Sequence, residues 1–139
     1  MTELAYLPQV NRLALSEDSF LRLRKNLPER ILTRADFLRK LRQISAFSQV
    51  FGNVRLRQYQ IEAANAIVDS VLQQKGLSIV VMFPRQSGKN MLQAQLEVYL
   101  MSLLGTHGAE MVKLSPTYQP QSLNAMRRLE TALQANYLT

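Results

Sequence analysis

The sequence predicts an α/β fold with a parallel sheet. Helical periodicity runs through residues 58–74, a short apolar run follows at 77–83, and another helix and another apolar run come after it. Short apolar runs that alternate with amphipathic helices are typical of strands buried on both faces of a parallel sheet. The expected order is therefore helix, strand, loop, helix, strand, loop, helix.

Each element of this order has its own pattern. The first helix has apolar residues at i, i+3, i+4, i+7 and i+8, namely Ala64, Ile67, Val68, Val71 and Leu72. The first strand is centred on Ile79–Val81, and Met111–Leu114 is the second strand. Between the strands we expect a helix to about Leu104, and after them a last helix that carries Leu123–Leu133.

Residues 1–53 are expected to form a basic, mainly helical N-terminal segment, with helices at about 16–25 and from about 33 to 44. Residues 1–57 contain 11 Lys+Arg and 5 Asp+Glu, whereas residues 58–139 contain 6 and 5. The basic part has two possible interpretations: a surface that faces nucleic-acid phosphates, or a solvated helix face.

Composition excludes several classes. With 47% apolar residues among 139, the chain can form a folded core. The absence of Cys and the single His exclude disulfides and a structural zinc site. No signal-peptide pattern opens the chain, and the longest apolar run, Ile79–Phe83, is too short to cross a bilayer. We expect a soluble cytoplasmic protein without membrane contact.

The segment with chemical content is Phe83-Pro-Arg-Gln-Ser-Gly-Lys89-Asn90, which leaves the expected strand and opens a helix. A helix N-terminus offers free backbone N–H groups and a partial positive charge, so it attracts anions. Gly88 allows close approach of a phosphate, and Lys89 can reach the β- and γ-phosphates of a nucleotide. This is the logic of the Walker A phosphate-binding loop.

Two positions depart from the standard Walker A pattern. Phe83 stands where the first glycine is expected, and Asn90 replaces the Ser or Thr whose hydroxyl binds Mg²⁺. An amide oxygen can also bind Mg²⁺, directly or through water, but less readily. An ordinary strand-to-helix turn that contains Gly-Lys is the alternative interpretation.

The segment Pro84–Lys89 resembles the variant Walker A motif of phage terminase large subunits, the ATPases that package DNA. Leu56–Gln60 is similar to the adenine-recognition segment of terminases and superfamily-two helicases, and Leu114–Gln119 to the segment that follows their second strand. The resemblance covers roughly residues 54–135. It implies an incomplete P-loop NTPase (RecA-like) domain at 54–139, with ATP and Mg²⁺ as cofactors.

The resemblance also implies roles for single residues. Lys89 would bind the β,γ-phosphates, and Arg85 would stabilise the γ-phosphate, which makes these two the expected catalytic residues. Pro84 begins the loop, the backbone N–H groups of Gln86, Ser87, Gly88 and Lys89 would hold phosphate, and Asn90 takes the metal position.

Further roles fall outside the loop. Gln60 would read the adenine edge, Arg57 would stack on the base, and Thr117 would contact a DNA phosphate or a moving coupling segment. For Gln60 and Arg57 the alternative is an exposed polar helix start, and for Thr117 a turn residue.

No carboxylate after the loop has the context of the Walker B acids that hydrolysis requires, since the acids there are Glu97, Glu110 and Glu130. We expect the chain to be the N-terminal part of a longer terminase, truncated before Walker B and inactive alone. The expected partners are double-stranded DNA and, in the full-length protein, the portal and the small terminase subunit. A superfamily-two DNA translocase fragment and a non-enzymatic basic DNA-binding module are the alternatives.

Overall fold

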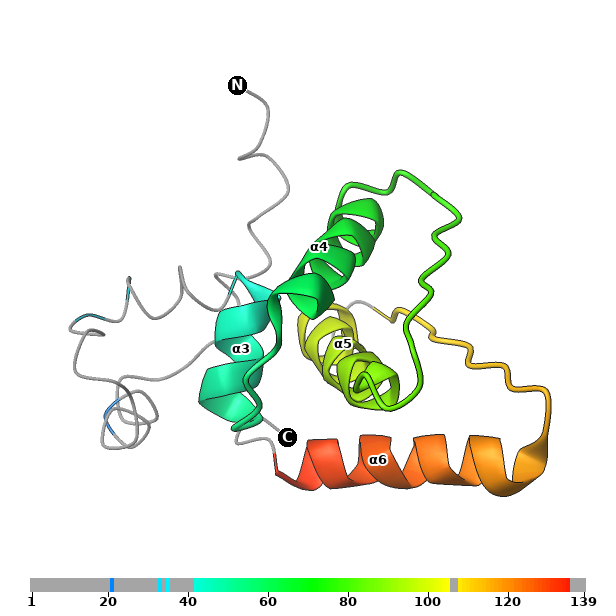
Figure 1. Cartoon of the computed structure of the whole chain (residues 1–139). Helices are drawn as coiled ribbons and strands as arrows, with labels where there is room; N and C mark the ends of the chain where they lie inside the picture. The colour runs from blue at the N-terminus through cyan, green and yellow to red at the C-terminus, as the bar shows by residue number, and fades with distance from the viewer. Residues whose placement is uncertain (1–20, 22–32, 34, 36–41, 106–107, 136–139) are drawn as a thin grey trace.

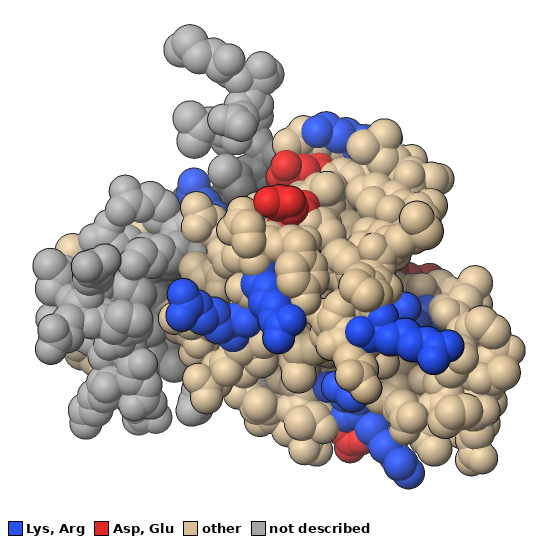
Figure 2. Space-filling model, viewed as in Figure 1, with Lys and Arg blue, Asp and Glu red and all other residues tan. Residues whose placement is uncertain are grey.

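A computed structural model describes residues 21, 33, 35, 42–105 and 108–135 of the chain. The described part is built on helices α3 (Ile44–Phe51), α4 (Gln58–Leu72), α5 (Lys89–Leu104) and α6 (Leu123–Gln134), with a short kinked turn, η3 (Tyr118–Ser122), before α6. Helix α5 lies at the centre and packs against α3, α4 and α6 (Figure 1). Figure 2 shows the same face in space-filling form.

The central position of α5 follows from its side chains. Its buried residues lie all around the helix rather than on one stripe: Leu92, Ala94, Gln95, Leu96, Glu97, Val98, Tyr99, Leu100 and Leu103. A helix that is buried on all sides needs neighbours on all sides, and α3, α4 and α6 supply them. Helices α4, α5 and α6 confirm the predicted helices, whereas α3 was not predicted as a separate element.

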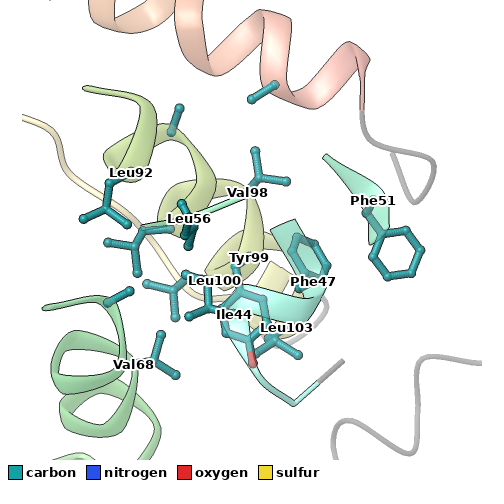
Figure 3. Packing of buried hydrophobic residues seen from close by; sticks show 14 residues of the cluster. Ile44, Phe47, Phe51, Leu56, Val68, Leu92, Val98, Tyr99, Leu100 and Leu103 are labelled. Atoms are coloured by element: carbon teal, nitrogen blue, oxygen red, sulfur yellow. The ribbon is translucent and has the colours of Figure 1, made fainter. Parts of the chain in front are cut away.

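The core forms where α3 meets α5. Phe47 packs edge-on against Tyr99 with ring centroids 5.0 Å apart, and it also contacts Phe51 at 5.1 Å (Figure 3). The Tyr99 hydroxyl donates a hydrogen bond of 2.8 Å to the Arg42 carbonyl. Burial first, and then the negative charge of Asp69, raise the pKa of Tyr99 to about 12.

The predicted α/β class is wrong for the described residues, which contain helices but no strand. Residues 77–83 and 109–115 are extended, as an apolar strand would be, but neither segment pairs with another. Their outer side chains are exposed: Val80 by 86%, Met82 by 89%, Val112 by 79% and Leu114 by 90%. An extended segment becomes a strand only when a neighbour accepts its backbone hydrogen bonds. The described part of residues 54–139 is therefore a helical unit and not the expected RecA-like domain.

An ion pair fixes the second extended segment to the core. The Lys113 ammonium contacts the Glu97 carboxylate of α5 at 2.7 Å and 3.0 Å, and the Glu97 side chain is 7% exposed. The buried carboxylate is thereby neutralised, and residues 109–115 are held beside α5.

Most of the basic N-terminal segment, including the helices expected at 16–25 and 33–44, lies outside the described residues. Within the part that the structure describes, no helix has the length and apolar character needed to cross a membrane.

Candidate phosphate-binding site

The loop Pro84–Gly88 joins the extended segment 77–83 to the first turn of α5. The Ser87 N–H donates to the Pro84 carbonyl at 3.4 Å, which closes a turn. Gly88 is the N-cap of α5 in the left-handed conformation, with φ of 80°. A Cβ at this position would lie 2.7 Å from Nε2 of Gln60. The left-handed backbone angle therefore favours glycine here, and a larger residue would also displace the amide of Gln60.

The start of α5 presents unused hydrogen-bond donors. The first intrahelical bond runs from the Leu92 N–H to the Gly88 carbonyl at 3.0 Å. The N–H groups of Lys89, Asn90 and Met91 precede this bond, and no side chain in the described part of the chain caps them. These donors, together with the positive end of a helix of 16 residues, favour an anion.

The N-terminus of α4 holds the loop in place. Nε2 of Gln60 donates to the Ser87 carbonyl at 3.1 Å and to the Gly88 carbonyl at 3.4 Å. The Tyr59 hydroxyl donates to the same Ser87 carbonyl at 2.7 Å. At its other end, Oε1 of Gln60 accepts the Arg57 N–H at 2.9 Å and so caps α4. One buried amide thus couples the cap of α4 to the loop.

Aromatic contacts add to these hydrogen bonds between α4 and the loop. The ring of Tyr59 meets Phe83 edge-on, with centroids 5.3 Å apart. Nη1 of Arg57 donates to the Tyr59 hydroxyl at 3.3 Å, which places the guanidinium beside the loop. Phe83, which stands where the Walker pattern has its first glycine, therefore anchors the loop to α4.

The loop borders a cavity of about 280 Å³. The lining residues come from the loop, the first turn of α5 and one position of α6: Phe83, Pro84, Arg85, Gln86, Ser87, Gly88, Lys89, Asn90, Met91 and Arg128. Three of them are cationic (Arg85, Lys89 and Arg128), and none of the described lining residues is acidic. Figure 2 shows basic side chains gathered over the start of α5 and over α6. This lining is suited to an anion.

Ser87 contributes a buried hydroxyl to the wall of the cavity. It is 7% exposed, it lines the cavity, and its Oγ has no hydrogen-bond partner among the described residues. Oγ of Ser48 and Nε of Arg42, which lie outside the cavity lining, are also buried without a partner among the described residues, so this feature alone does not indicate a ligand.

The structure brings the predicted loop residues together, because Pro84–Asn90 all line this cavity. Gln60 and Arg57 lie beside the loop but not in the cavity lining. Gln60 is 5% exposed and both ends of its amide are hydrogen-bonded, so an adenine edge would have to replace one of these bonds. Thr117 is placed away from the cavity lining, before η3, where its carbonyl accepts the Ser122 N–H at 3.2 Å.

Two residues of the site were not predicted. Tyr59 lies within the segment 56–60, whose resemblance to an adenine-recognition segment is the signal that points to it. Arg128 lies in α6, and no local pattern marks it, because its place in the cavity depends on the packing of α6 against α5.

Among the described residues no three His, Cys, Asp or Glu side chains group into a metal site. Asn90 lines the cavity. Its side-chain oxygen could bind a Mg²⁺ ion whose other ligands are mainly phosphate oxygens.

Comparisons with known proteins identify no relative: no family model matches the chain, and neither a curated protein nor a solved structure is significantly similar.

Proposed function

We propose that the loop Pro84–Asn90 binds the phosphate chain of ATP together with Mg²⁺. The observation that carries this proposal is the combination of a left-handed Gly88, the free N–H groups of the first turn of α5, and a cavity lined by cations without a carboxylate among its described residues. The proposal concerns this loop and its helix and requires no sheet.

Each lining group has a function in this proposal. The N–H groups of Lys89, Asn90 and Met91 donate to phosphate oxygens, and the side chains of Lys89 and Arg85 neutralise their charge. Asn90 supplies an oxygen ligand to the metal ion.

The size of the cavity favours the phosphates over the whole nucleotide. The cavity volume of about 280 Å³ is just below the range of small-molecule pockets, roughly 300–1,000 Å³. The base and ribose would therefore lie outside, towards the start of α4, where the Arg57 guanidinium is exposed beside the loop. Stacking of Arg57 on the base is part of the proposal.

The wider function rests on the sequence resemblance alone. By this resemblance we propose that the chain is the ATP-binding part of a terminase-like DNA-packaging ATPase. The full-length protein would act on double-stranded DNA in the host cytoplasm, with a portal and a small terminase subunit as partners. Because no described residue of the cavity lining is acidic, the proposal for these residues is binding of ATP rather than its hydrolysis.

The test is calorimetric titration of the chain with Mg-ATP and with inorganic tripolyphosphate. Lys89→Ala should weaken both by about 10- to 100-fold, the value of a hydrogen bond between charged groups. Lys75→Ala is the matched control, since Lys75 is an exposed lysine outside the cavity lining, and its affinity should equal that of the wild type. Equal affinity of the Lys89→Ala variant and the wild type, or no binding by the wild type, would overturn the proposal.

A further inference from the structure

Helix α6 contributes a cation to the cavity that the loop sequence does not contain. Arg128 lines the cavity beside Lys89 and Arg85, although α6 begins only at Leu123. Its guanidinium makes no ion pair or hydrogen bond with a described residue, and its side chain is exposed. Arg128 is therefore free to bind a ligand.

The arrangement of the helices places Arg128 across the loop from α4. Helix α5 packs against both α4 and α6, and Figure 1 shows it between them. Tyr59 and Gln60 of α4 hold the Ser87 carbonyl, so α4 occupies one side of the loop and α6 the other. A phosphate chain whose nucleoside lies towards α4 would point its terminal phosphate towards α6.

A second cavity continues from this side. It has a volume of about 380 Å³ and shares Asn90 and Arg128 with the first cavity. Its other lining residues are Asn124, Arg127 and Thr131, all on α6, so its described lining also contains cations and no carboxylate. The positive potential therefore extends past the loop along α6.

From these observations we infer that Arg128 binds the terminal phosphate and so makes the site selective for triphosphates over diphosphates. A guanidinium can bind two phosphate oxygens in parallel, which a lysine ammonium cannot do with the same geometry. The charge of Arg128 is opposed by no described carboxylate at the cavity, so the terminal phosphate is its natural counter-ion. This inference rests on the proposed function and assigns a specificity-determining residue to it.

The experiment compares affinities for Mg-ATP and Mg-ADP in the wild type and in three variants. Arg128→Gln should weaken ATP binding by about tenfold or more and ADP binding by less than about threefold. Arg128→Lys keeps the charge but not the two parallel bonds, and its ATP affinity should lie between those of Arg128→Gln and the wild type. Arg127→Gln is the matched control, because Arg127 lines only the second cavity and its loss should leave the ATP-to-ADP affinity ratio unchanged.

The possible results separate the inference from the proposal on which it rests. If the wild type binds ATP and Lys89→Ala weakens binding as expected, but Arg128→Gln keeps the wild-type ATP-to-ADP affinity ratio, the role of Arg128 is wrong and the loop proposal stands. An equal loss of ATP and ADP affinity in Arg128→Gln would also contradict selectivity for the terminal phosphate. If the wild type binds neither nucleotide, both are wrong. Far-UV circular dichroism of each variant checks that the helices are intact.

Discussion

Gln60 is the residue whose replacement should most clearly expose the coupling between α4 and the loop. Gln60→Ala removes the hydrogen bond to the Arg57 N–H at 2.9 Å and the bond to the Ser87 carbonyl at 3.1 Å. Each bond contributes about 1 kcal/mol net, and loss of the buried methylene adds about 0.8 kcal/mol. The contact to the Gly88 carbonyl adds little because, at 3.4 Å, it is longer than a typical N–H···O hydrogen bond. The free energy of unfolding should therefore fall by about 3 kcal/mol.

Urea denaturation followed by circular dichroism measures this loss, and Gln58→Ala is the matched control. The Gln58 side chain is exposed and bonds only Glu62 on the same helix, at 3.2 Å, so its replacement should change stability by less than about 0.5 kcal/mol. Gln60→Glu separates the two ends of the amide: it keeps the acceptor for the Arg57 N–H, but the ionised carboxylate cannot donate to Ser87. Equal stabilities of Gln60→Ala and Gln58→Ala would refute the role of Gln60 in holding the loop against α4.

Three further predictions concern the core. Because burial raises the pKa of Tyr99 from 10.0 to about 12, the stability that its protonated hydroxyl contributes should be complete below pH 10 and lost as the pH rises towards 12. Urea unfolding across that range should show this loss in the wild type and a smaller loss in Tyr99→Phe; identical profiles would contradict it. Lys113→Met should destabilise the chain by about 3 kcal/mol, because it leaves the Glu97 carboxylate buried and unpaired, and adding Glu97→Leu should recover most of the loss. If the double variant is no more stable than the single one, the ion pair is not the cause. Val98→Ala, at a residue 1% exposed, should cost about 2–3 kcal/mol, and Val80→Ala, at a residue 86% exposed, less than about 0.5 kcal/mol in the same denaturation assay. Similar costs at the two valines would contradict the assignment of the core.

The helices could be predicted because their information is local. Side chains such as Ala64 and Val68 recur at the helical period and are buried on the same side of α4. The strands could not be predicted in the same way, since Ile79–Val81 shows apolar character but not whether a neighbouring segment pairs with it. In the described part of the chain the backbone at 77–83 is extended but pairs with no other strand, so the apolar pattern predicts the extended conformation but not the sheet.

The candidate site was also predictable where local sequence determines it, and not where tertiary contacts determine it. The loop from Pro84 to Asn90 was predicted from residue types and position, because a glycine and a lysine at a helix start have direct geometric consequences. The packing of Gln60 against the Ser87 carbonyl and the approach of Arg128 from α6 depend on tertiary contacts, which one sequence does not reveal.

Binding of a phosphate chain at the N-terminus of α5 can be observed at individual backbone amides. The most direct measurement is a series of ¹H–¹⁵N correlation spectra of the chain during titration with tripolyphosphate. We expect the backbone amides of Lys89, Asn90 and Met91 to shift most and Lys89→Ala to reduce these shifts, because their N–H groups have no partner among the described residues. Shifts centred elsewhere, with these three amides unchanged, would contradict it.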